Sequence, residues 1–172
     1  MSNEETEGSP RERAGFVTGV SYPEEFLHYA ITLCESASRY IDILSPALDH
    51  AAFDSAELSS ALSALARRSR QTRVRILVQD ARNVVSRGHQ LLALARRLPS
   101  TVHIQVLAEH PDWNGQTVVL RDRDGVLYRP AESDNKGFYE PDSRASTQRH
   151  LELFEELWRY SVQDPQLRAL HL

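Results

Sequence analysis

The sequence predicts an α/β fold: a mostly parallel β-sheet with an added antiparallel hairpin and helices on both faces. Three observations lead to this prediction. Short apolar stretches rich in β-branched residues alternate with amphipathic helical stretches up to residue 106. An Asp-Gly turn then joins two further strands, and a last helical stretch with a wide apolar face follows. Strands separated by helices favour crossover connections and parallel pairing, with helices packed on the sheet.

The first helix and strand are predicted from local patterns. Pro23 is tolerated in a first helical turn, and apolar residues recur three and four positions apart from Leu27 to Cys34. This helix is therefore expected to end near Ser38. Residues 40–44 are short, apolar and closed by a Ser-Pro turn, which indicates a strand.

Two more helix–strand pairs follow. Either Asp54 or Ser55 can cap the next helix, whose apolar residues from Leu58 to Leu65 share one face. The remaining elements up to residue 106 are a strand over 74–78, a helix that ends before Pro99 and a strand over 102–106.

The pattern changes after residue 106. Residues 116–121 and 126–129 are predicted strands, joined through Asp124-Gly125, a strong hairpin signal. Residues 130–143 carry two prolines and a glycine, so they are predicted to form a loop. A last helix begins near Arg144.

Length and composition indicate one globular domain. The chain has 172 residues, of which 41% are hydrophobic and 26% charged, ordinary values for a soluble protein. One core accounts for every periodic stretch. We therefore expect a flexible acidic tail over 1–20 and a single domain over 21–172.

Several classes of protein are excluded by simple features. No apolar run approaches the roughly 20 residues of a membrane-spanning helix, and the acidic N-terminus is unlike a secretory signal. Cys34 is the one cysteine, so neither an internal disulfide nor a cysteine-based metal site is expected. Glycine-rich nucleotide loops and histidine pairs with metal-ligand spacing are absent, so no cofactor and no metal are expected. A cytoplasmic location follows as the default.

Positive charge is concentrated in one segment. Residues 67–97 contain nine arginines and a single acid, Asp80, giving a formal charge of +8 in a chain whose net charge is −4. Guanidinium groups match phosphate oxygens, which favours a phosphate-bearing ligand or nucleic acid, with Arg82 and Arg87 among the binding residues. The alternative is a solvated arginine-rich helix face, the more common role of such a run.

A candidate binding site is expected where the parallel strands end. Ligands of open parallel sheets bind beyond the carboxyl ends of the strands, and helix starts there favour anions. The candidates are Asp80, Arg82, His89 and His110. The alternative is structural: Asp80 caps the next turn and pairs with Arg82. Asp42, inside an apolar strand, needs a partner, and a cross-strand pair with Arg75 or an edge position is expected.

The sequence of residues 37–80 resembles that of a known family. An apolar strand that ends in Ser45-Pro46 precedes a helix, and a second strand of alternating basic and apolar residues then ends near Asp80. These features resemble the N-terminal half of a phospholipase D-like domain. Gly88-His89 and the strand over 102–106 continue the same order, so the resemblance extends over about residues 23–160. It implies a phospholipase D-like fold and a homodimer.

The catalytic motif of that family, His-x-Lys-x-x-x-x-Asp, is missing. If its aspartate is placed at Asp124, Thr117 and Val119 stand where histidine and lysine belong; if at Asp122, Gly115 and Thr117 do. The reaction needs a nucleophilic histidine and a lysine that holds phosphate oxygens. The resemblance therefore supplies no catalytic residue, and the chain is expected to be a degenerate, non-catalytic member.

Three functions remain open. The first is a non-catalytic phospholipase D-like module that binds a phosphate-containing ligand or nucleic acid through residues 67–97. The second is a protein-interaction or dimerisation module without a small ligand, using the last helix or the edge of the hairpin. The third is a phosphodiesterase with a rebuilt site at Asp80 and His89. Salt-dependent binding separates the first from the second, because phosphate contacts release counterions.

Overall fold

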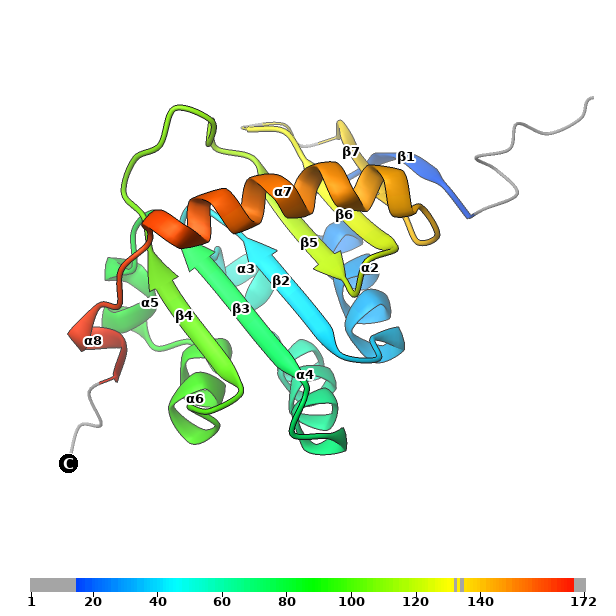
Figure 1. The fold of residues 1–172 in the computed structure, drawn as a ribbon. Helices are drawn as coiled ribbons and strands as arrows, with labels where there is room; N and C mark the ends of the chain where they lie inside the picture. Colours follow the sequence, from blue (N-terminus) through cyan, green and yellow to red (C-terminus); the bar gives the residue numbers. More distant parts are fainter. Residues whose placement is uncertain (1–14, 132, 134, 169–172) are drawn as a thin grey trace, which may run out of the picture.

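A seven-stranded mixed sheet forms the centre of the molecule. The computed structural model describes residues 15–131, 133 and 135–168. The strands lie in the order β1-β7-β6-β5-β2-β3-β4 (Figure 1). They are β1 (Val17–Val20), β2 (Tyr40–Leu44), β3 (Arg73–Val78), β4 (Val102–Val106), β5 (Thr117–Arg121), β6 (Gly125–Arg129) and β7 (Gly137–Glu140).

Helices cover both faces of this sheet, as predicted. In Figure 1, α2, α4 and α6 lie behind the sheet and α7 runs across its front. The helices are α2 (Glu24–Ser36), α3 (His50–Phe53), α4 (Ala56–Arg68), α5 (Arg82–Arg87), α6 (Gln90–Arg97), α7 (Arg144–Tyr160) and α8 (Pro165–Arg168). In the part of the chain that the structure describes, no helix is long and apolar enough to cross a membrane.

The prediction of a mostly parallel sheet is wrong. Only β2–β3 and β3–β4 pair in parallel. The four other pairings, β1–β7, β2–β5, β5–β6 and β6–β7, are antiparallel. The reason is that the predicted hairpin joins the sheet in the antiparallel sense beside β2, and two further short strands extend it on that side.

Two of these strands were not expected from the sequence. β7 lies inside the predicted loop over 130–143, and Gly137 is what permits it. A Cβ at Gly137 would lie 2.9 Å from the carbonyl oxygen of Tyr128 and 3.0 Å from that of Val20. The glycine thus lets three backbones approach closely. β1 occupies the end of the predicted tail over 1–20, of which residues 1–14 lie outside the described part of the chain.

Hydrophobic packing on the two faces fixes the layers. Behind the sheet, Phe26 and Leu62 of the helices pack with Ile43 and Ile76 of the strands, all with no exposed surface. On the front, Leu44, Leu77, Val118 and Leu120 pack beneath Phe154 and Leu157 of α7. Burial of each such side chain contributes about 1.5–3 kcal/mol to the stability of the folded state.

Serine caps define the starts of α4 and α7. Ser55, one of the two expected caps, accepts a hydrogen bond from the backbone N–H of Leu58 at 3.2 Å. Ser143 does the same for Ser146 at 3.2 Å. Such caps satisfy amide groups that have no partner within the helix. Asp54 instead accepts from the backbone N–H of Gln90 at 2.8 Å, which ties α6 to the loop before α4.

Candidate functional site

Asp80 and Arg82 form a local ion pair just beyond the end of β3. Arg82 donates from its backbone N–H to Asp80 Oδ1 at 2.9 Å, and its Nη2 lies 2.7 Å from Oδ2. The hydrogen bonds from Arg82 hold the pKa of Asp80 below its usual range. Asp80 also donates its own N–H to the carbonyl of Pro46 at 3.1 Å. These contacts are those of the structural alternative, a turn cap and its paired arginine.

His89 is buried, and backbone groups occupy both of its ring nitrogens. Nδ1 accepts from the backbone N–H of Leu91 at 3.0 Å, so His89 caps α6. An accepting Nδ1 places the proton on Nε2, which donates to the carbonyl of Leu48 at 3.1 Å. Burial lowers the pKa of His89 to about 4, so the ring is neutral at pH 7. Neither nitrogen is free to act as a base or to contact a ligand.

The other predicted residues lie apart from these two groups. Arg87 is exposed at the end of α5. His110 accepts at Nδ1 from the N–H of Asp112 at 3.1 Å, and its ring lies 5.8 Å from that of Tyr160. Among the described residues, no hydrogen bond or ion pair joins Asp80, His89 and His110 to one another. These residues therefore make separate local contacts at the carboxyl ends of the strands.

Positions aligned with the missing catalytic motif have structural roles. Thr117 and Val119 are buried in β5, with 1% and 0% of their surface exposed. Asp122 accepts from the backbone N–H groups of Ser38, Arg39 and Tyr40 at 2.8–2.9 Å. Asp124 pairs with Arg121 at 3.0 Å. The side chains at these positions therefore pack within the sheet or hold its turns.

Asp42 pairs with Arg75 across neighbouring strands, one of the two expected arrangements. The other, an edge position, is wrong, because β2 lies between β5 and β3. The two residues are in register in the β2–β3 pair, and Arg75 Nε lies 2.7 Å from Asp42 Oδ1. Sequence reasoning missed the rest of this cluster. The carboxylate of Glu155 in α7 accepts hydrogen bonds from both terminal nitrogens of Arg75, at 3.0 and 2.6 Å. The guanidinium carbon of Arg75 lies 4.8 Å from the centre of the Phe154 ring.

The arginines of residues 67–97 are divided between the two ends of the sheet. Arg82 and Arg87 follow the carboxyl end of β3, and Arg75 is buried. The others end or follow α4, begin β3 or end α6, so they lie where the parallel strands start. The turn between β5 and β6 reaches the same edge, because Arg121 pairs with Ile41 at the start of β2.

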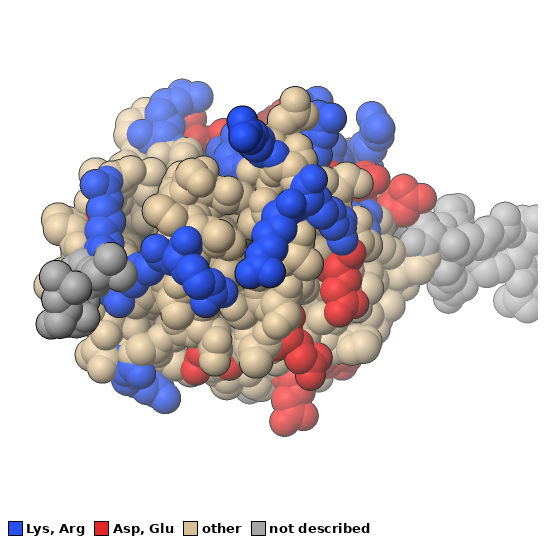
Figure 2. All heavy atoms as spheres, turned by 90° about the horizontal axis from the view of Figure 1, so that it is seen from below, with Lys and Arg blue, Asp and Glu red and all other residues tan. Residues whose placement is uncertain are grey.

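Eight arginines are exposed at this edge, which we call the basic edge. They come from several segments of the chain and are Arg39, Arg67, Arg68, Arg70, Arg73, Arg97, Arg123 and Arg144. Figure 2 looks onto this end of the molecule: basic side chains spread across it, and acidic ones gather toward one side. Within the described ranges, no carboxylate forms an ion pair with any of the eight.

A shallow hollow opens within the basic edge. It has a volume of about 270 Å³ and lies between the start of β2 and the β5–β6 turn. Arg39, Arg123 and Arg144 line it together with Ser38, Tyr40 and two carboxylates, Asp122 and Asp124. Both carboxylates already have partners, the three backbone N–H groups and Arg121. Three guanidinium groups around one hollow provide donors that suit phosphate oxygens. Sequence reasoning missed these three because they lie outside residues 67–97, although each lies at the boundary of a predicted element.

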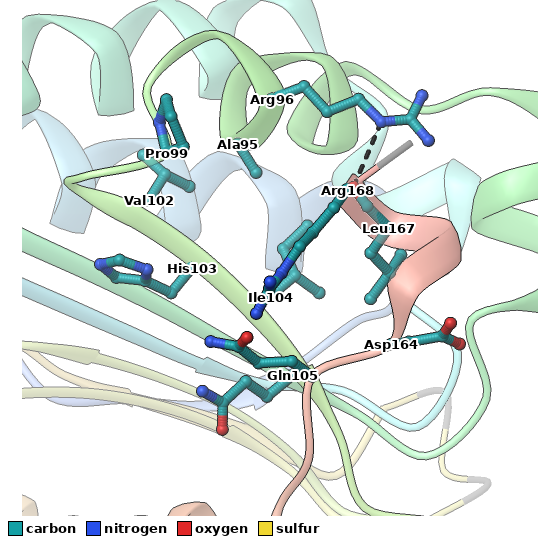
Figure 3. Close-up of a pocket in the computed structure, with 11 residues that line it drawn as sticks. Ala95, Arg96, Pro99, Val102, His103, Ile104, Gln105, Asp164, Leu167 and Arg168 are labelled. Atoms are coloured by element: carbon teal, nitrogen blue, oxygen red, sulfur yellow. Dashed lines mark hydrogen bonds between the residues drawn. The ribbon is translucent and has the colours of Figure 1, made fainter. Parts of the chain in front are cut away.

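A second, larger hollow lies along β4. It has a volume of about 460 Å³ and is lined by α6, β4 and the segment leading into α8. In Figure 3, Arg168 extends from α8 toward Ile104 and Gln105, and Arg96 Nε donates to the carbonyl of Leu167 at 3.2 Å. Among the described residues, no group of three or more His, Cys, Asp or Glu side chains is placed to hold a metal ion.

Solved structures of the phospholipase D family share this fold. Nuc from Salmonella typhimurium, a phospholipase D family member, matches with a TM-score of 0.61 and 14% identity over 86% of this chain and 97% of its own. NucT from Helicobacter pylori matches with a TM-score of 0.62 and 16% identity over 87% and 99%. The predicted phospholipase D-like fold is therefore confirmed.

A third similar structure is TrmBL2, an archaeal chromatin protein. It matches with a TM-score of 0.63 and 15% identity over 94% of this chain, which spans 57% of the length of TrmBL2. No curated protein matches the chain by sequence. One family model does, over residues 22–170. The chain belongs to the family described as "Domain of unknown function (DUF7931)", and its fold is that of the phospholipase D-like proteins.

Proposed function

We propose that the protein is a non-catalytic phospholipase D-like module that binds the phosphate backbone of nucleic acid at the basic edge. One observation carries the proposal: eight exposed arginines from separate segments gather where the parallel strands begin, and no described carboxylate pairs with them. Arginine forks bind phosphate oxygens with two parallel hydrogen bonds. A net charge of −4 does not oppose such binding locally, because the charge is asymmetric.

The similar structures support this proposal by analogy. TrmBL2 is described as a chromatin protein with a novel mode of DNA binding. A DNA-binding protein therefore contains a similar fold over 57% of its length. Without a motif histidine at Thr117 or Gly115, the chain has no nucleophile for the family's covalent chemistry at the matching position. Binding without cleavage is the function that these two facts favour together.

The carboxyl ends of the strands are the competing location for the ligand. The sequence predicts a site there with Asp80, Arg82, His89 and His110, and Arg87 of the arginine-rich segment follows the same end of β3. The basic edge is the better candidate, because Asp80 already neutralises Arg82 and backbone groups occupy both nitrogens of His89. A rebuilt phosphodiesterase site would need His89 to be free at one nitrogen.

The test compares two triple variants of equal charge change. The first replaces Arg67, Arg70 and Arg97 of the basic edge with Gln; the control replaces Arg82, Arg87 and Arg159, which are also exposed. Fluorescence anisotropy measures binding of labelled DNA and RNA as salt is raised. We expect the first variant to bind more weakly, with a logarithmic salt slope smaller by about two for single strands, because three phosphate contacts are lost.

The opposite result would change the location or the function. If the control variant loses binding and the basic-edge variant does not, the ligand lies at the carboxyl ends. If wild-type protein binds no nucleic acid even at low salt, the basic edge is a solvated surface.

In that case a dimerisation module becomes the better proposal. Tyr160 and Val162, at the end of α7, have 56% and 63% of their surface exposed and could contact a second copy. Sedimentation velocity measures the oligomeric state directly. A homodimer and a cytoplasmic location stay predictions from the sequence.

A further inference from the structure

The front face of β2, β3 and β4 carries a regular set of polar and aromatic side chains. Residues two apart on a strand point to the same face, and residues in register on parallel strands share a face. Arg75 contacts α7, so it faces the front. Tyr40 and Arg73 are in register with each other, two residues before Asp42 and Arg75, and His103 of β4 is in register with Arg75.

Helix α7 covers only part of this face. Leu44 and Leu77, toward the carboxyl ends of the strands, pack beneath Phe154 and Leu157 of α7. The Asp42–Arg75 pair lies at the border of the covered part, where Glu155 reaches it. Beyond that border, toward the starts of the strands, no described helix lies over the sheet, as Figure 1 shows.

Planar groups occupy the uncovered part. The Arg73 guanidinium carbon lies 5.1 Å from the centre of the Tyr40 ring, a cation–π contact. His103 adds a second ring on β4, in register with Arg75 and therefore two residues further along the strands than Arg73. Neighbouring strands lie about 4.8 Å apart. Arg73 is exposed, and Tyr40 and His103 are half-buried, so the three groups are accessible from the front.

This planar surface adjoins the basic edge directly. Arg73 belongs to both, and Tyr40 lines the same 270 Å³ hollow as Arg39, Arg123 and Arg144. A ligand whose charged backbone lies along the arginines therefore has its uncharged planar parts beside Tyr40 and Arg73. Nucleotides have this division between phosphate and base, and every base can stack on an aromatic ring or a guanidinium plane.

We propose that the uncovered face formed by Tyr40, Arg73 and His103 is a stacking platform for the bases of a single-stranded nucleic acid. The inference rests on the proposed function and adds the class of substrate to it. In a duplex the bases stack on one another and only their edges are accessible. A platform that binds base faces therefore selects single strands, of RNA or DNA, over double strands.

The test uses labelled single-stranded RNA, single-stranded DNA and duplex DNA of about 15 nucleotides or base pairs, in the range of single-strand site sizes. Tyr40→Leu and His103→Leu remove the rings and keep apolar bulk, whereas Tyr40→Phe keeps the ring. Tyr160→Leu is the matched control, because Tyr160 is exposed at the far end of α7. Thermal unfolding of each variant checks that the fold is kept.

We expect single strands to bind more tightly than the duplex. Tyr40→Leu should weaken single-strand binding at least about fivefold with an unchanged salt slope, because loss of one stacked base costs about 1 kcal/mol or more. His103→Leu should act in the same direction, and Tyr40→Phe and Tyr160→Leu should bind like wild type. The RNA and DNA arms show which sugar is preferred, and either preference fits the platform.

Three results would overturn the platform, and they differ in what else they remove. If Tyr40→Leu and His103→Leu bind like wild type, or if the duplex binds as tightly as the single strands, base stacking is wrong. The basic edge then stands if its triple variant still loses binding. If no probe binds the wild-type protein at low salt, the platform and the proposed function both fail.

Discussion

Arg75 lies between two carboxylates and beside two aromatic rings of α7. It is 4% exposed, it bonds Asp42 and Glu155, and its guanidinium carbon lies 4.8 Å from the Phe154 ring centre. We predict that Arg75→Met lowers the free energy of unfolding by about 3–5 kcal/mol, because it leaves the buried Asp42 without its partner. Urea unfolding measures this loss. The control is Arg82→Met, which removes the exposed ion pair with Asp80 and should change the free energy of unfolding little.

The loss from Arg75→Met should also depend on pH. Burial raises the pKa of Asp42, and Arg75 opposes that rise. Without Arg75 the folded protein keeps Asp42 protonated at pH values where the unfolded chain, with an ordinary pKa of about 3.9, has released the proton. Stability then falls as pH rises above about 4, so the deficit should be larger at pH 8 than at pH 5. An equal deficit at both pH values would contradict this account.

His89 should make the protein less stable in mild acid. Its pKa is lowered to about 4, first because it is buried, so the folded state binds fewer protons than the unfolded state between about pH 6.5 and 4. Stability therefore falls as pH decreases through this window, by up to about 3 kcal/mol. His89→Asn keeps a cap for α6 and cannot titrate, so its urea midpoint should change less over the same window. His150, whose pKa burial also lowers, remains in both proteins.

Single residues were predictable where a local rule applied. A buried acid needs a partner, and this rule predicted the Asp42–Arg75 pair from two strands alone. Glu155 could not be predicted, because its contact depends on how α7 crosses the sheet. The Asp80–Arg82 contact is local, and the structural alternative described it correctly. The burial of His89 depends on three-dimensional packing around Leu48, which no local pattern encodes.

At the scale of elements, Asp122 joins two turns that are distant in sequence. It lies in the turn between β5 and β6 with a φ of +48°. Its side chain accepts hydrogen bonds from three backbone N–H groups of the α2–β2 connection. We predict that Asp122→Ala lowers the free energy of unfolding by about 2 kcal/mol or more. The variant loses the charged acceptor of three hydrogen bonds and a residue type that tolerates this φ. Asp122→Asn, which tolerates this φ and keeps one oxygen, should cost less.

Hydrogen exchange can locate the effect of Asp122→Ala. The amides of Ser38, Arg39 and Tyr40 should exchange faster in the variant, whereas the amides of α6 should be unchanged. Equal exchange at the three amides in variant and wild type would show that Asp122 does not hold this connection. Because the basic edge includes Arg39 and Arg123, a loosened connection should also weaken nucleic-acid binding.

Elements with strong periodicity were predicted correctly, and short ones were not. The amphipathic helices α2, α4, α6 and α7 and the strands β2 to β6 each follow a pattern of four or more positions. β1 and β7 are four residues long, and each contains a glycine that weakens the strand signal. Missing them made the sheet look mostly parallel, because both add antiparallel pairs on the side of the hairpin.

At the scale of the whole molecule, the arginine-rich segment proved to be two surfaces. A parallel strand joins the two ends of the sheet, so residues a few positions before and after β3 lie at opposite ends. Net charge counted along the sequence could not show this. Topology could have: helix ends that precede parallel strands share one edge, and Arg67, Arg68 and Arg97 lie at such ends. The basic edge was therefore predictable in part, and the candidate residues at the other end were chosen by a general rule for open sheets.

This separation of the two ends gives a prediction for the whole molecule. If nucleic acid lies along the basic edge, hydrogen–deuterium exchange with and without a bound oligonucleotide should show protection at one end only. Protection is expected around residues 38–40, 67–73, 97–102 and 122–124, which surround the starts of the parallel strands. The loops that follow the same strands should exchange as in the free protein.

The same measurement can reject the assignment, because every parallel strand has an amide-bearing loop at each end. Protection confined to residues 45–50 and 79–89 would instead place the ligand at the carboxyl ends of the strands, beside Asp80, Arg82 and His89. Protection at both ends would indicate a general tightening of the sheet. A footprint at the basic edge that disappears in the Arg67, Arg70 and Arg97 variant, and persists in the control variant, requires direct contact there, since the two proteins have the same net charge.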